Sequence, residues 1–212
     1  MAVKLDFAYA NNKLHHISED LYKHVDYTCP FCKEVLIFRK GEIKEHHFSH
    51  KPNSNCTATV ETALHFNAKH YLQSECENPS GYDIFFDFPI RKHVPAINDL
   101  ADIIDIKDEY TVSLNDILVF YRAICGCLVE HRVGPYIADT YVQTKGNDKG
   151  FVVEVCVTHE MEEDKRAFLT KNKIPYLELT PTPKDNSKIE FSLKSYFYLS
   201  FLIAIEIKLI KN

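Results

Sequence analysis

A cluster of cysteines and histidines near the N-terminus places the strongest constraint on how this chain can fold. Cys29 and Cys32 are separated by two residues, so one tight turn can direct both sulfurs at a single ion. A second pair of ligands follows between His47 and Cys56. Sulfur and imidazole ligands with this spacing are typical of a tetrahedral Zn²⁺ site closed by four side chains. The cluster therefore predicts that the first quarter of the chain folds around a metal.

This segment offers one ligand more than a four-coordinate site needs. Besides Cys29 and Cys32 it contains His47, His50 and Cys56. We expect His50 and Cys56 to complete the site, and the alternative completion is His47 with His50. Because four protein ligands leave no open position for water, the expected role of the zinc is structural.

The pattern of apolar residues divides the chain into a small module and a larger domain. Short expected strands surround the ligand pairs, which is the layout of a zinc-ribbon-like module over residues 1–57. From residue 58 the spacing becomes helical, and strands and helices then alternate. Residues 151–157 are apolar at nearly every position, as in a buried central strand. We expect an α/β protein in which residues 58–212 form a mixed sheet flanked by helices.

Turn signals and periodicity predict the remaining elements. The turn-prone pair Asn11-Asn12 separates two expected short strands. A turn is expected at 145–150, and the Thr-Pro repeat at 180–183 is expected to be a linker. The other expected elements are strands at 3–9, 13–17, 35–39, 82–89, 100–107, 127–133, 136–143 and 174–179, and helices at 113–123 and 160–173.

Composition limits the classes of partner. The net charge of −5 excludes a uniformly basic surface for nucleic acid, although a local basic patch is compatible with it. The cysteine count of 7 is odd and the first residues lack the apolar core of a secretory signal, so we expect reduced thiols and a cytoplasmic protein. Residues 196–210 are apolar, but Glu206 and Lys208 interrupt them and they fall short of a membrane span. We expect a packed terminal helix there, or a contact for a protein partner or for self-association.

Two acidic residues stand on neighbouring expected strands. Asp139 lies on one strand, and Glu154 interrupts the apolar strand that follows. A carboxylate on a buried strand is costly unless a cation or hydrogen bonds compensate for it. Two such carboxylates side by side suit Mg²⁺ or Mn²⁺, which can activate a water for attack on a phosphodiester. The alternative is a structural ion pair of Glu154 with Arg132 or with a lysine.

The expected helix after residue 58 carries polar residues at regular spacing. Glu61, His65 and Lys69 are each four residues apart, which keeps them on one face of the helix. All three can therefore point at one site. The alternative is a solvated helix face with a favourable charge pattern.

A longer series of motifs runs in order from about residue 20 to residue 180. It comprises Cys29-x-x-Cys32, His47-Phe48-x-His50, Cys56, Glu61-Thr62-x-x-His65-x-x-x-Lys69, Ala138-Asp139 and Glu154-Val155-Cys156-Val157-Thr158-His159. In this order they resemble the competence protein CoiA-like family. The resemblance implies a zinc module followed by a restriction-endonuclease-like, PD-(D/E)xK domain, and hence a metal-dependent DNA endonuclease or a DNA-processing nuclease.

The resemblance also implies roles for individual residues. Asp139 and Glu154 would bind Mg²⁺ or Mn²⁺, and Glu61 would be an additional acid on the first core helix. Thr158 and His159 would close the pocket at the end of the strand. His159 would either contact a metal ligand or simply begin the next helix.

One position departs from the family pattern. The residue two after the second acid should be Lys or Gln, but here it is Cys156, and a neutral thiol cannot stabilise an anionic phosphate. A cation from elsewhere then has to steady the developing charge, and Lys69 and Lys165 are the candidates. The alternative is a nuclease-fold protein that has lost catalysis and binds nucleic acid or a protein partner.

Overall fold

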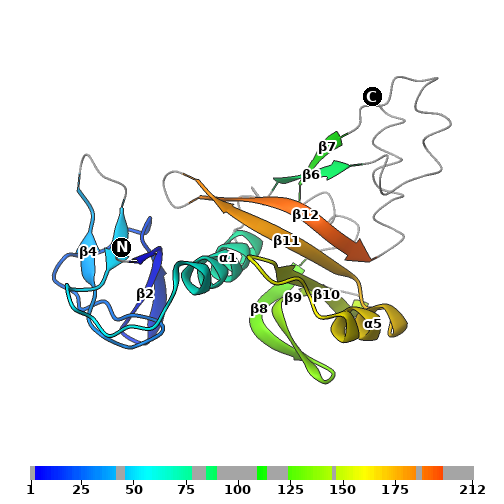
Figure 1. Cartoon of the computed structure of the whole chain (residues 1–212), viewed down its shortest axis with the longest axis horizontal. Coiled ribbons are helices and arrows are strands. Elements are labelled where there is room, and N and C mark those ends of the chain that lie inside the picture. Colours follow the sequence, from blue (N-terminus) through cyan, green and yellow to red (C-terminus); the bar gives the residue numbers. More distant parts are fainter. Residues whose placement is uncertain are drawn as a thin grey trace. The chain divides into compact units, whose positions relative to one another are not determined.

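The computed structural model describes residues 3–41, 46–77, 85–89, 109–113, 124–144, 147–184 and 188–197. The chain forms two compact units. The first comprises 1–68 and 182–189, and the second comprises 69–181 and 190–212. The described residues contain two helices among many strands, so the fold is a mixed α and β fold (Figure 1).

The first unit is built from short strands. A three-stranded sheet has the order β1-β5-β4, and β2 pairs with β3 in a hairpin. Both central residues of that hairpin, Asn11 and Asn12, have positive φ, at 50° and 62°. Asparagine tolerates this conformation, and such turns match the twist of the strands they join. These elements are β1 (Lys4–Leu5), β2 (Phe7–Ala10), β3 (Lys13–His16), β4 (Ile37–Arg39) and β5 (His47–Ser49).

An apolar core lies beneath these strands. Leu5 and Phe48 are fully buried, and Tyr27 is 3% exposed. The rings of Tyr27, Phe38 and Phe48 pack together with centroids 5.1 to 5.7 Å apart. Burial of large aromatic rings contributes strongly to stability, so the first unit does not depend on metal ligands alone.

Helix α1 (Val60–Glu77) begins where the sequence pattern predicts it. The hydroxyl of Thr59 accepts a hydrogen bond from the backbone N–H of Thr62 at 3.0 Å, which caps the first turn. Ala63, Ala68 and Leu72 are buried and form its apolar side.

The second unit contains a five-stranded sheet in the order β12-β11-β10-β9-β8. Strand β9 pairs antiparallel with both β8 and β10, whereas β10 pairs parallel with β11 through the crossover helix α5. Figure 1 shows α5 beside these strands. The elements are β8 (Ile124–Val133), β9 (Tyr136–Thr144), β10 (Asn147–Val155), α5 (Glu163–Lys171), β11 (Tyr176–Pro183) and β12 (Ile189–Phe197), with a separate pair formed by β6 (Phe85–Pro89) and β7 (Glu109–Ser113).

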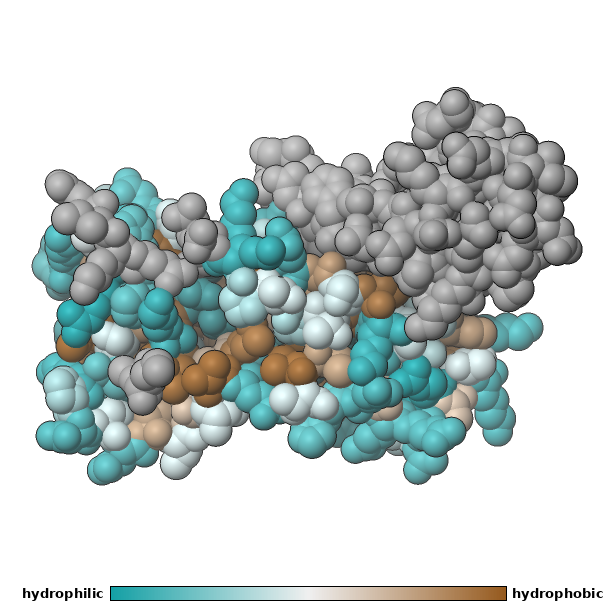
Figure 2. All heavy atoms as spheres, turned by 45° about the horizontal axis from the view of Figure 1, so that its top comes forward, coloured by the Kyte–Doolittle hydropathy of each residue, from teal (hydrophilic) through white to brown (hydrophobic). Residues whose placement is uncertain are grey.

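Strand β10 is central, as its apolar sequence predicts. Residues 151 to 156 are all buried, and this includes Glu154, which is 7% exposed. On the face shown in Figure 2, hydrophilic side chains cover most of the coloured surface and apolar ones form small patches. Because residues 151 to 156 are buried, the long apolar run of β10 is interior, as expected for a strand with neighbours on both sides.

Several element boundaries differ from the prediction. The expected linker at 180–183 is the end of β11, and residues 147–150 of the expected turn belong to β10. Strand β12 occupies 189–197, where no strand was expected. The expected strand at 100–107, the expected helix after Ser113 and the apolar segment after Phe197 lie outside the described residues. Among the described helices, none has the length and apolarity needed to cross a membrane.

Candidate metal-binding sites

The first two ligands of the cysteine–histidine cluster lie on a tight knuckle. The backbone N–H of Cys29 donates to the carbonyl of Glu34 at 2.8 Å, and the N–H of Lys33 donates to the carbonyl of Cys29 at 3.1 Å. Lys33 has a φ of 64°, which lets the chain reverse direction directly after Cys32. The N–H of Phe31 points at the Cys29 sulfur at 3.4 Å. The turn thus holds the Cys-x-x-Cys pair ready for a metal.

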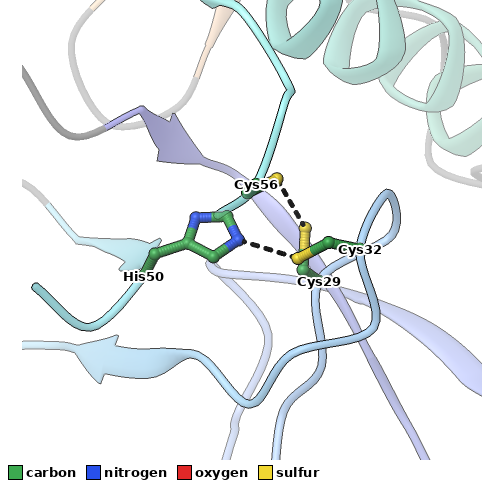
Figure 3. Close-up of side chains that lie close together, drawn as sticks. All are labelled: Cys29, Cys32, His50 and Cys56. Carbon is green, nitrogen blue, oxygen red and sulfur yellow. Dashed lines mark hydrogen bonds between the residues drawn. The ribbon is translucent and has the colours of Figure 1, made fainter. Parts of the chain in front are cut away.

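Four ligand atoms converge at this knuckle. The sulfurs of Cys29 and Cys56 are 4.0 Å apart, and Cys32 Sγ is 3.3 Å from His50 Nε2 (Figure 3). All four atoms lie within 4.8 Å of one another. Sulfurs bound to one tetrahedral Zn²⁺ would be about 3.8 Å apart, given a Zn–S bond of about 2.3 Å. The group therefore fits a Cys₃His zinc site, and it contains His50 and Cys56 and not His47.

Burial keeps the Cys29 thiol of the cluster protonated unless a metal ion binds. Cys29 is fully buried, and burial is the main reason that the pKa of its thiol rises to about 12 without metal. The neighbouring Cys56 adds to this rise. Zinc binding has to displace the thiol proton, and the bound ion then compensates the buried thiolates. Zinc binding at this cluster would therefore be coupled to the folding of the first unit.

The two acids that the sequence singled out meet in the second unit. The backbone N–H of Val155 donates to Asp139 Oδ2 at 2.9 Å, and the N–H of Asp139 donates to Glu154 Oε1 at 3.3 Å. The pairing of Val153 with Thr140 aligns β10 and β9 so that the acids are neighbours. Two hard carboxylate ligands side by side are a donor set that suits Mg²⁺ or Mn²⁺.

Lysines from two helices reach this acid pair. Lys165 of α5 places its Nζ 2.5 Å from Glu154 Oε2 and 2.7 Å from the carbonyl of Ile137. Lys69 of α1 places its Nζ 3.9 Å from Asp139 Oδ1. The cationic partner of Glu154 is therefore a lysine, one of the alternatives that the sequence left open. Cys156 itself is buried, and burial raises the pKa of its thiol.

Glu130 of β8 is a member of this group that the sequence analysis missed. Its Oε1 is 2.8 Å from Lys69 Nζ, and this hydrogen bond is the main reason that the pKa of Glu130 is lowered. The tight β8–β9 turn contains Gly134 at φ 61° and fixes the register of the hairpin. Glu130 lies between residues that pair with Thr140 and Ala138, and hence opposite Asp139. A register argument from that turn would have found it.

The environment of Glu154 shifts its titration towards neutral pH. Burial is the largest cause, the adjacent Asp139 carboxylate is the second, and together they raise the pKa of Glu154 to about 7. Lys165 acts in the opposite direction. A second cation would stabilise the ionised pair, as expected for carboxylates that share a site.

The crossover helix α5 is attached to the sheet by a buried acid. Glu178 of β11 is fully buried and lies beside Glu154 in the parallel register of β10 and β11. Its carboxylate accepts hydrogen bonds from Arg166 at 3.1 Å and from the hydroxyl of Ser195 at 2.6 Å. This network orients α5, and α5 carries Lys165.

The remaining predicted residues lie before Lys69 on α1 and after the end of β10. Glu61 is exposed in the first turn of α1 and belongs to the first unit, whereas Lys69 belongs to the second. Eight residues of helix correspond to a rise of about 12 Å, so a shared face does not bring Glu61 and Lys69 to one point. His65 is half-buried, and Thr158 and His159 are exposed after β10.

Comparison with known families bears on the first of the two sites. Residues 10–59 match the family model described as competence protein CoiA, N-terminal domain. The chain has a CoiA-like N-terminal domain. The match contains all four residues of the zinc cluster and ends before α1, so it leaves the acid pair outside. No curated protein and no solved structure matches the chain.

Zinc retention tests the ligand set of the CoiA-like domain. We expect about one Zn²⁺ per chain in the natural protein, and a loss of nearly all of it in His50→Ala, because three ligands leave the tetrahedral site open. His47→Ala should keep its zinc, and so should Cys76→Ala, which removes a cysteine outside the cluster. Metal analysis after exhaustive dialysis provides the measurement. Equal loss of zinc in His47→Ala and His50→Ala would contradict this assignment.

The titration of Glu154 tests the electrostatics of the acid pair. We expect Asp139→Asn to lower the pKa of Glu154, because it removes a neighbouring negative charge. Lys165→Met should raise it, because it removes the compensating ammonium. Carbon-detected NMR of the side-chain carboxyl, in metal-free buffer, reports both changes. Lys171→Met at the far end of α5 is the control, and shifts of the same sign in the first two variants would refute the argument.

Proposed function

We propose that the chain is a Mg²⁺- or Mn²⁺-dependent deoxyribonuclease that hydrolyses phosphodiester bonds in DNA. The observation that carries the proposal is the meeting of Asp139 and Glu154 with Lys69 and Lys165 from two helices. The mixed sheet beside these helices is compatible with the restriction-endonuclease-like domain that the family resemblance implies.

Asp139 and Glu154 would each supply a carboxylate ligand to a divalent cation. Asp139 is already oriented by the N–H of Val155, so one carboxylate oxygen is fixed by the backbone of the neighbouring strand. Glu154 contributes the second carboxylate and ionises near neutral pH. When bound, such a cation supplies a water of lowered pKa and polarises the phosphate. The protein orients the acids, and burial shields Glu154 from most of the solvent.

Lys165 supports the proposal by supplying the cation that Cys156 lacks. Its ammonium group hydrogen-bonds to Glu154, at the position where a hard cation would also bind. With a divalent ion at Glu154, the ammonium group of Lys165 would no longer be needed by this carboxylate and could contact a phosphate oxygen. The hydrogen bonds of Glu178 to Arg166 and Ser195 fix α5, so Lys165 would remain within reach of the site. Lys69 stays beside Asp139 and limits repulsion between the acids.

A second function, DNA binding without cleavage, is favoured by the same departure from the family pattern. Cys156 stands in the place of the usual lysine, and the Nζ of Lys165 already has two acceptors. A binding protein of this kind needs no divalent ion, and its affinity for DNA falls with salt but not on loss of the acid pair.

Cleavage assays with acid variants distinguish the two functions. With Mn²⁺ or Mg²⁺ we expect the natural chain to cut linear, branched or single-stranded DNA. Asp139→Ala and Glu154→Gln should each lower the rate at least about 100-fold, because each removes a ligand of the ion that activates water. Glu163→Gln, which removes an acid from the first turn of α5, is the matched control. Unchanged cleavage in Asp139→Ala would remove the basis of the proposal.

Substitutions that remove or keep the positive charge of Lys165 test its role in cleavage. We expect Lys165→Met to lower the cleavage rate about 100-fold at saturating DNA, because the developing negative charge loses its cation. Lys165→Arg keeps the charge and should recover part of the rate. Lys69→Met is expected to act mainly on metal affinity, measured as the Mn²⁺ concentration for half-maximal rate. A Lys165→Met enzyme with the full rate would instead show that this lysine only stabilises Glu154.

A further inference from the structure

An open cavity of about 600 Å³ lies in the first unit next to the zinc cluster. Basic side chains line it, and none of its described lining residues is acidic. Two of those lining residues, His50 and Cys56, also belong to the zinc group. A cavity with one sign of charge concentrates ligands of the opposite sign, so its chemistry selects anions.

Arg39 is the best-positioned cation of this cavity. It lies on β4 opposite His47 of β5, and its Nε donates to the hydroxyl of Ser49 at 3.0 Å. Ser49 is 5% exposed, so a buried group fixes one edge of the guanidinium. Arg39 forms no ion pair within the described residues, which leaves its remaining N–H donors for a ligand. A planar fork fixed on one side suits two oxygens of one phosphate.

Two further groups add to the attraction for an anion. Lys51 is exposed at the cavity and has no carboxylate partner within the part of the chain that the structure describes. Zn²⁺ with three thiolates carries a net charge of −1. Arg39 and Lys51 together outweigh this charge, and their side chains reach further into solvent than the buried cluster.

The zinc ligand His50 contributes a hydrogen-bond donor. Its Nε2 faces the Cys32 sulfur, and its Nδ1 lies on the opposite side of the ring (Figure 3). A histidine that binds metal through one nitrogen usually donates the other N–H to an oxygen acceptor. No such acceptor for His50 exists among the described residues, although the ring lines the cavity. A phosphate oxygen would fill this role.

We propose that this cavity binds a backbone phosphate of DNA. Arg39 would engage two phosphate oxygens, Lys51 would add charge, and His50 would donate its Nδ1–H. Contacts of this kind position a duplex without reading its sequence. The identity of the ligand rests on the proposed nuclease function, but the binding itself needs neither Asp139 nor cleavage.

A second cavity, also lined by described residues of the first unit, lacks these properties. It measures about 440 Å³ and includes the acidic Asp26 in its lining. Its lysine, Lys33, donates to the carbonyl of Pro30 at 2.8 Å and lies over the ring of Tyr9. An anion there would meet a carboxylate and a lysine that is already engaged.

Binding of labelled duplex DNA to the zinc-loaded full chain, without Mg²⁺ or Mn²⁺, tests the proposal. We expect the double variant Arg39→Gln/Lys51→Gln to bind about tenfold more weakly, with the slope of log K against log salt reduced by about 1, because one phosphate contact is lost. Lys13→Gln/Lys23→Gln removes two exposed lysines of the same unit outside the cavity lining and should bind as the natural chain does. Metal analysis and circular dichroism confirm that each variant keeps its zinc and its fold.

A nitrogen-detected NMR signal of His50 gives a second readout. We expect the Nδ1–H resonance to shift when a short duplex is added, and not to shift in the double variant. Unchanged affinity of the double variant, or equal weakening in the lysine control, would overturn the proposal.

A parallel Mn²⁺ cleavage assay distinguishes a failure of the proposed phosphate site from a failure of the proposed nuclease function. Cleavage by the natural chain with normal DNA binding of the double variant rejects the phosphate site alone. Absent cleavage with weakened binding rejects the nuclease alone and supports the site.

Discussion

The burial of the Glu154 carboxylate on a central strand is the constraint on which the second unit depends. An isolated charge in that position is strongly unfavourable, so the surrounding elements have to supply compensation. The backbone N–H of Asp139 and the ammonium group of Lys165 do so, from a neighbouring strand and from the crossover helix. An apolar residue at position 154 would avoid the desolvation cost of a buried charge. Packing of the core alone therefore does not explain a carboxylate at this position.

The position of Lys165 depends in turn on a second buried acid. Glu178 is paired with Arg166 and Ser195, and these partners come from α5 and β12. Arg166 and Lys165 are adjacent in sequence, so one helix end serves two carboxylates on parallel strands. Removal of one partner from such a buried network leaves an uncompensated charge, which makes the arrangement cooperative.

Sequence patterns predicted those features that depend on neighbours in the chain. The Asn11-Asn12 turn, the Cys-x-x-Cys knuckle and the start of α1 follow from local backbone and capping preferences. The apolar run before Glu154 likewise predicted a buried strand. The resemblance to CoiA-like proteins holds for residues 10–59, where ligand spacing is itself the signal.

Features that depend on tertiary pairing were not accessible in the same way. Prolines at 181 and 183 suggested a linker, yet these residues end β11, because proline is tolerated near the end of a strand. The role of Glu130 follows from hairpin register, and the choice of Lys165 as the partner of Glu154 follows from how α5 crosses between parallel strands. Helical spacing alone placed Glu61 with Lys69, but a shared face does not specify distance along the axis.

The two metal-binding groups of the chain differ in what they leave open. Three sulfurs and one imidazole would fill a tetrahedron around zinc, so this site would have no position for a reacting water. Two carboxylates cannot fill the coordination shell of a hard cation. Such a cation would keep several positions for water and for phosphate oxygens. The lysines beside the open pair are bound to its carboxylates, whereas next to the closed cluster Lys51 has no carboxylate partner among the described residues and Arg39 is held by a neutral hydroxyl. A lysine next to a carboxylate can exchange with a divalent cation, whereas an arginine on a neutral anchor keeps its charge for an incoming anion. This distribution of partners is the physical basis for proposing catalysis in the second unit and attachment of the substrate backbone in the first.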